Sequence, residues 1–272
     1  MESLQPQNDQ MRAYEQDEDS QIKDFTPKQL KAYHELKELS RVYTEEKVEN
    51  RVSHPMFLAI DQQIRFLRAR DFDSKKALEM FKKWVDWRLE FKADQIDPES
   101  IRSLLLKETI ILHKNDLQNR YCIIIRARFH TPKAQTIEDL IRYGIYLIEQ
   151  ATFRTEQMGS KQLAVIYDRN GMTSDNRDTQ LMSFTTKFIS LLQDFYAERL
   201  AMVYVLHANW LYKLAFGIVK PFLAQKTKEK IKIIGDIKEL VQFFDADCLL
   251  PEHGGTSNYA YDPFSEFGLN RE

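Results

Sequence analysis

The chain has 272 residues, of which 43% are hydrophobic and 29% are charged, enough for a large core in one or two domains. Its formal net charge of −2 excludes a whole-chain field that would attract nucleic acid or an anionic membrane. The two cysteines stand far apart in apolar surroundings, which is typical of reduced thiols. We find neither an apolar leader nor a run of about 18 apolar residues, so we expect a cytoplasmic protein without a membrane span.

Helical patterns fill the first part of the chain. Residues 1–25 are rich in Gln, Asp, Glu and Asn, as in a disordered acidic tail. Thr26 and Pro27 then form a helix start, because Thr caps helices and Pro suits the first helical position. Apolar residues follow at helical spacing, so we predict an all-helical domain over residues 26–110.

Strands alternate with helices in the rest of the chain. The predicted strands are 121–129, 162–168, 200–209 and 231–235, and the predicted helices are 138–158, 178–196, 210–223 and 236–244. This alternation predicts an α/β domain over residues 111–258 with a largely parallel sheet. The strands are apolar throughout, which favours a sheet covered on both faces. Residues 259–272 are expected to form a C-terminal tail.

Catalytic and metal-binding patterns are missing from the sequence. None of the six histidines stands at metal-ligand spacing, so His207 and His253 are interpreted as ordinary core or surface residues. Asp168 precedes an Asn-Gly turn and is interpreted as a residue that stabilises this turn. No nucleophile elbow, P-loop or dinucleotide fingerprint occurs. We therefore expect no enzyme activity, no cofactor and no metal.

Arg65, Arg68 and Arg70 form a basic run. No aromatic platform or second basic stripe accompanies it, so a solvated helix face is favoured over a nucleic-acid site.

The segment 210–223 is apolar on nearly every face of its predicted helix. Such a helix is buried or covers something apolar. Gly217 and Pro221 weaken it internally. Two interpretations stay open: a kinked core helix that crosses the sheet, and a lid that hinges over a hydrophobic cavity.

Thr227 and Lys230 follow this helix. If their turn is helical, the two side chains lie three residues apart on one face, where a hydroxyl and an ammonium group together suit a phosphate. The alternative is a solvated pair without a ligand.

Several motifs resemble one known family. They are RFLRARDFD (65–73), ALEMFKKWVDWR (77–88), YAERL (196–200), ANWLYKLAFGIVKPFL (208–223), TKEKI (227–231) and LLPEHGGT (249–256). In this order and spacing, residues 30–258 resemble the CRAL-TRIO lipid-binding family. The branch that they resemble most is that of the secretory-pathway phosphatidylinositol transfer proteins.

The resemblance implies a helical N-terminal bundle followed by a mixed sheet that floors a hydrophobic lipid pocket. It implies no catalysis. It implies phosphatidylinositol exchange between membranes with presentation to phosphoinositide metabolism, a phospholipid as ligand, transient contact with a membrane surface, and a monomer. The implied headgroup residues are Arg70, Glu198, Thr227 and Lys230, and the implied gate residues are Trp210, Leu214, Phe216, Gly217, Phe222 and Leu223.

Three positions depart from the family pattern. Asp71 stands where these phosphatidylinositol binders usually carry Lys. In the stretch that contributes to choline binding, Thr173 is the possible second headgroup residue, but Asp175 stands where a hydroxyl is expected. Ala197 replaces a proline. The lipid therefore stays open, and so do two other functions: a carrier of a sterol, retinoid- or tocopherol-like molecule, and a lipid-sensing regulatory scaffold.

Overall fold

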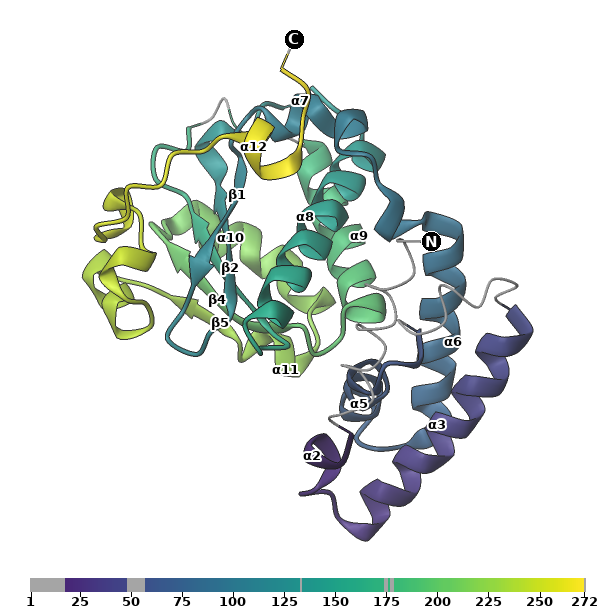
Figure 1. Cartoon of the computed structure of the whole chain (residues 1–272). Helices are drawn as coiled ribbons and strands as arrows, with labels where there is room; N and C mark the ends of the chain where they lie inside the picture. Colours follow the sequence, from purple (N-terminus) through teal and green to yellow (C-terminus); the bar gives the residue numbers. More distant parts are fainter. Residues whose placement is uncertain (1–17, 48–56, 133, 174–175, 177–178, 272) are drawn as a thin grey trace. The chain divides into compact units, whose positions relative to one another are not determined.

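The computed structural model describes residues 18–47, 57–132, 134–173, 176 and 179–271 (Figure 1). They divide into two compact units, one ending at Phe91 and one beginning at Lys92. The sequence placed this boundary near residue 110. Residues 93–105 belong with the second unit because their short helical turns pack against its helix α8 (Ile137–Gln157).

The first unit is helical, with α2 (Glu18–Ile22), α3 (Pro27–Lys47), α5 (Ile60–Ala69) and α6 (Ser74–Phe91). Helix α3 starts as predicted: the Gln29 amide N–H donates to Thr26 Oγ1 and the Thr26 N–H donates to Gln29 Oε1. The core consists of side chains with almost no exposure: Tyr33, Leu36, Phe66, Leu67, Phe81 and Trp84.

Two predictions for this unit need correction. Part of the expected disordered tail is helix α2, because Glu18 binds Lys37 at 2.6 Å and accepts from the Tyr33 hydroxyl at 2.9 Å; residues 1–17 lie outside the described residues. Arg65 is not solvated. It is 7% exposed, and its guanidinium lies 4.1 Å from the Phe66 ring centroid.

The second unit is a mixed α/β fold, as predicted. Short turns come first: η1 (Ala93–Gln95), η2 (Pro98–Ile101) and α7 (Arg102–Leu105). The strands are β1 (Ile110–Asn115), β2 (Tyr121–Arg126), β3 (Leu163–Asp168), β4 (Leu200–Leu206) and β5 (Ile231–Ile233). Between them lie η3 (Ala127–Phe129), α8, α9 (Thr179–Phe195), α10 (Trp210–Val219), η5 (Lys220–Phe222) and α11 (Gln225–Lys228). After β5 follow η6 (Ile237–Gln242), η7 (Ala246–Cys248), η8 (Pro251–His253) and α12 (Pro263–Phe267).

The five strands lie in sequence order in one sheet, and all neighbours are parallel except β1 and β2. The prediction missed β1, which falls partly in the segment assigned to helices. In this short edge strand, three consecutive residues, Ile111–His113, are buried. The strand therefore lacks the alternation of buried and exposed residues by which a sequence reveals a strand.

One face of the sheet is sealed. Cys122, Ile124, Ile166, Tyr204 and Leu206 point to this face and pack against residues of the segment 234–250. The segments after β5 cover it, whereas α8 and α9 lie on the other side (Figure 1). The arrangement follows from the strand order, because right-handed crossovers that always step in one direction place their helices on one face.

Candidate functional site

The sheet face opposite the sealed core is apolar but only partly covered. Val165 and Tyr167 on β3, Val203 on β4 and Ile231 on β5 keep partial exposure, and Ile233 is 48% exposed. The strand registers place all five on the same face. The sheet therefore offers an apolar face on which these five side chains, beside the buried Val205, keep part of their surface accessible.

Helix α9 is also apolar, and its side chains are likewise only partly buried. None of its described side chains is fully buried, although α6, of almost equal length, buries six. The partly exposed members are Leu181, Met182, Phe184, Phe188, Ile189, Leu191, Leu192 and Phe195. A helix with this composition is normally buried or in contact with an apolar ligand.

Helix α10 has one inner and one outer apolar side. Asn209 begins it by accepting from the Tyr212 N–H at 3.1 Å. On the inner side, Tyr212 is buried, lies 6.4 Å from the Tyr167 ring and stacks on Phe216 at 5.6 Å. The helix ends at Val219, followed by a 3₁₀ turn that contains Pro221.

The outer side of α10 and its following turn is an apolar stripe open to solvent. Its four side chains stand at every fourth position, and we call them the outer stripe: Trp210 (70% exposed), Leu214 (62%), Ile218 (53%) and Phe222 (54%). Three of the four belong to the gate predicted from the sequence, and Ile218 is a further exposed apolar residue on the same side. Phe216 is half-buried and Leu223 is buried, so neither faces solvent in this conformation.

Gln193 on α9 holds the backbone that follows α10 and its 3₁₀ turn. Its Nε2 donates to the Phe222 carbonyl at 3.0 Å, and its Oε1 accepts from the Ala224 N–H at 2.6 Å. These two bonds span the buried Leu223. The sequence could not indicate this clamp, because a lone Gln within an apolar helix has no signature of its own.

The predicted headgroup residues of the second unit lie at the amino end of the parallel strands. The turn with Thr227 and Lys230 is helical, as expected, since α11 covers its first part and the Lys230 N–H donates to the Thr227 carbonyl at 3.1 Å. Lys230 Nζ donates to the Leu200 carbonyl at 2.7 Å. Leu200 is two residues beyond Glu198, so the structure brings the YAERL and TKEKI motifs together.

Glu198 has a left-handed backbone conformation, with φ of 62°. Its carbonyl accepts from Gln162 Nε2 at 3.2 Å, and its neighbour Arg199 is buried and bound to Glu156 at 2.8 Å. Non-glycine residues adopt this conformation infrequently, and at Glu198 it forms part of the turn between α9 and β4.

Arg70 and Asp71 belong to the first unit, where they end helix α5. Arg70 Nη1 donates to the Ala69 carbonyl at 3.0 Å. Asp71 has φ of 48°, a conformation that Asp tolerates better than Lys. The left-handed backbone at this position therefore suits the aspartate that the chain carries.

Thr173, the possible second headgroup residue, is exposed, and its N–H donates to Asn176 Oδ1 at 2.9 Å. Asp175 lies outside the described residues.

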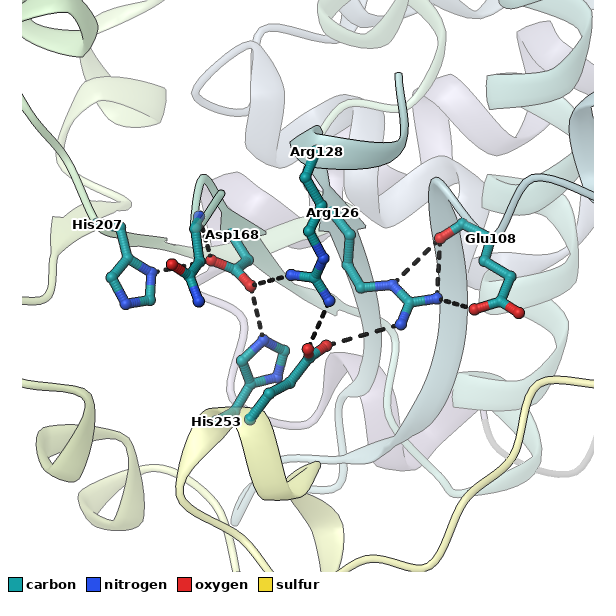
Figure 2. Close-up of polar contacts among 8 residues, drawn as sticks. Glu108, Arg126, Arg128, Asp168, His207 and His253 are labelled. Atoms are coloured by element: carbon teal, nitrogen blue, oxygen red, sulfur yellow. Dashed lines mark hydrogen bonds and ion pairs between the residues drawn. The ribbon is translucent and has the colours of Figure 1, made fainter. Parts of the chain in front are cut away.

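A charged cluster that the sequence did not reveal lies at the carboxyl end of the strands (Figure 2). Asp168, at the end of β3, is 1% exposed. Its carboxylate lies 2.9 Å from His207 Nδ1, 3.3 Å from His253 Nε2 and 3.3 Å from Arg128 Nη1. Burial raises the pKa of Asp168, but hydrogen bonds from His253, the Asn170 N–H and His207 outweigh it and hold the pKa far below its usual range.

Further pairs extend the cluster. Arg128 also binds Glu252 at 2.5 Å, and Arg126 binds Glu108 at 2.7 Å and lies 3.6 Å from Glu252. Asp168, Glu252 and His253 lie close enough together to hold a metal ion. The two guanidinium groups, however, already neutralise these carboxylates. We therefore interpret the cluster as a structural ion network that ties β2, β3, the end of β4 and η8 together.

Among the described residues, no helix is both long and apolar enough to cross a membrane. Both cysteines are free thiols, with Cys122 buried.

Comparisons with known proteins agree with this architecture. A CRAL-TRIO domain-containing protein of Schizosaccharomyces pombe is 28% identical over 208 residues, covering 73% of this chain and 46% of that protein. Patellin-3 of Arabidopsis thaliana is 25% identical over 277 residues, covering 93% and 56%. The chain thus spans about half the length of these two relatives. The Sec14 cytosolic factor of S. pombe is 27% identical over 211 residues, covering 71% of this chain and 73% of that protein.

A solved structure shares the fold. The crystal structure of Sfh5 superposes with a TM-score of 0.67 at 15% identity, covering 87% of this chain and 90% of Sfh5. The family model of the CRAL/TRIO domain matches residues 107–255, more than half of the chain. The chain therefore belongs to the CRAL-TRIO family of lipid-binding and lipid-transfer proteins.

Proposed function

We propose that this protein binds phosphatidylinositol, exchanges it between membranes and presents it to phosphoinositide metabolism. The observation that carries the proposal is the partly open apolar surface of the sheet, α9 and α10. At its amino end lie Lys230 and the turn of Glu198. An acyl chain fits the apolar surface, and a phosphate fits the ammonium group.

The physics of lipid transfer calls for a gate. A diacyl lipid has about thirty methylenes, and at about 0.8 kcal/mol each their exposure to water would cost on the order of 25 kcal/mol. The lipid must therefore pass directly into a bilayer. The outer stripe of α10 is suited to meet that bilayer, because its apolar side chains stand next to the exposed cations Lys213 and Lys220.

The headgroup residues would select the lipid. Lys230 Nζ now donates to a backbone carbonyl, an acceptor that a phosphate oxygen can replace or supplement. Charge-assisted hydrogen bonds are each worth about 1.5–3 kcal/mol, enough to choose among lipids. Thr227 lies on the same turn and would add a hydroxyl donor. We place the protein in the cytoplasm as a monomer that visits membrane surfaces transiently.

The test is Lys230→Ala, with Lys228→Ala from the same turn as matched control. We expect Lys230→Ala to abolish phosphatidylinositol transfer between vesicles while the protein stays folded, with a lower unfolding temperature from the lost bond to the Leu200 carbonyl, and Lys228→Ala to transfer normally. Mass spectrometry of lipids that co-purify from a eukaryotic host identifies the natural ligand. Unchanged transfer by Lys230→Ala, or a sterol or other neutral hydrophobe as the dominant bound molecule, would overturn the proposal.

A further inference from the structure

Arg169 places a cation on the apolar side of the sheet. It directly follows β3, at the carboxyl end of the parallel strands. Its guanidinium lies 6.0 Å from the ring centroid of Tyr167 and 5.3 Å from that of Tyr212. Tyr167 belongs to the partly open sheet face and Tyr212 to the inner side of α10. The guanidinium therefore sits where the sheet and the gate helix meet.

This cation has no counter-ion among the described residues. Its Nε is buried and has no hydrogen-bond partner. The nearby arginines behave differently, since Arg126 and Arg128 each bind a carboxylate. A buried guanidinium nitrogen without a partner is unfavourable, and contact of the cation with aromatic faces compensates only in part. The site therefore lacks one component, an anion.

The surroundings favour an anion that carries an apolar chain. Burial raises the pKa of Tyr212 to about 12, so its phenol stays neutral and does not repel an anion. Val165 and Val203 continue the apolar face away from Arg169. Guanidinium groups bind carboxylate and phosphate in a two-pronged geometry that an ammonium group cannot match.

We propose that Arg169 binds the anionic head, a carboxylate or a phosphate, of an amphiphile whose chain lies along the open sheet face. This site is distinct from the Lys230 site. Lys230 contacts Leu200 at the start of β4, whereas Asp168, next to Arg169, pairs with Leu206 at the end of β4. The length of this strand separates the two cations by about 20 Å. The proposal rests on the apolar surface serving as a lipid site, as in the proposed function, but not on the identity of the headgroup at Lys230.

The test is binding of the fluorescent fatty acid cis-parinaric acid, with its methyl ester as the uncharged control. One charge-assisted pair of about 1.5–3 kcal/mol corresponds to an affinity change of about 10–150-fold. We expect the acid to bind at least tenfold more tightly than the ester, and Arg169→Leu to remove this preference. Arg169→Lys should retain part of it, and Lys213→Leu, which removes an exposed cation of α10, should retain all of it.

Competition separates the two sources of the anion: oleate displaces the probe better if the site prefers a carboxylate, and oleoyl lysophosphatidate does so if it prefers a phosphate. Equal binding of acid and ester, or an unchanged preference in Arg169→Leu, would refute the proposal.

Measuring phosphatidylinositol transfer by the same variants distinguishes the Arg169 site from the proposed function. Arg169→Leu should still transfer phosphatidylinositol and Lys230→Ala should still bind the acid. A wild-type protein that binds the acid through Arg169 without transferring phosphatidylinositol would refute only the proposed function.

Discussion

Phe222 and Phe153 form a matched pair for testing the outer stripe. Each is 54% exposed, but Phe222 lies on the stripe and Phe153 lies on α8. Full burial of a phenylalanine side chain is worth about 1.5–3 kcal/mol, so the exposed fraction of Phe222 can contribute about 0.8–1.6 kcal/mol when it enters a bilayer. Phe222→Ala should therefore weaken vesicle binding by about 4–15-fold, since 1.4 kcal/mol is a factor of ten.

Co-sedimentation with vesicles of phosphatidylcholine and phosphatidylserine measures this effect. Phe153→Ala should bind vesicles like the unmodified protein, although its equal exposure predicts a similar small loss of folding stability. The lipid-transfer rate should fall with Phe222→Ala alone. Equal loss of vesicle binding in both variants, or no loss in either, would show that α10 is not the membrane-facing element.

Three further variants address the fold and the gate. Asp168→Asn should lower the free energy of unfolding by about 1.5–3 kcal/mol in denaturant titrations, because Arg128, which keeps Glu252, loses a charge-assisted bond to the buried carboxylate. Burial lowers the pKa of His113 to about 4, against about 6.5 in the unfolded chain. The unfolded chain therefore binds the extra proton between these values, and the fold loses about 2 kcal/mol by pH 5; His113→Phe should remove that part of the acid sensitivity. Gln193→Ala should accelerate lipid exchange severalfold, measured between vesicles, because it releases the backbone on both sides of Leu223.

Local signals explain what the sequence predicted well. The Thr26–Pro27 helix start, the strand at β3 and the helix at α9 depend on capping and periodicity within a few residues, and the structure confirms all three. The TKEKI turn was likewise recognisable, because Thr227 and Lys230 are neighbours in sequence.

The missed features depend on distant segments. Asp168, His207 and His253 come from the end of β3, the end of β4 and the turn η8, and single-residue interpretations treated each as ordinary. One signal was available: the carboxyl ends of neighbouring parallel strands meet at one edge of a sheet, so polar residues directly after two predicted strands should lie together. Strand order could not have identified His253 of η8 as a partner, because no periodicity in the sequence predicts where the chain after β5 packs against the sheet.

The strand order links the ion network to the start of α10. A sheet wound in one direction carries its helices on one face, so the chain after β5 must return to seal the other face. The chain after β5 places the His253 ring 3.3 Å from the Asp168 carboxylate. Asp168 also binds His207, which lies three residues before α10 begins. The end of β4, just before α10, is thus tied to the sealed side of the sheet, whereas the backbone after α10 is held by hydrogen bonds from Gln193 on α9. We therefore expect α10 to open from the Phe222 end, with the strand end near His207 staying in place.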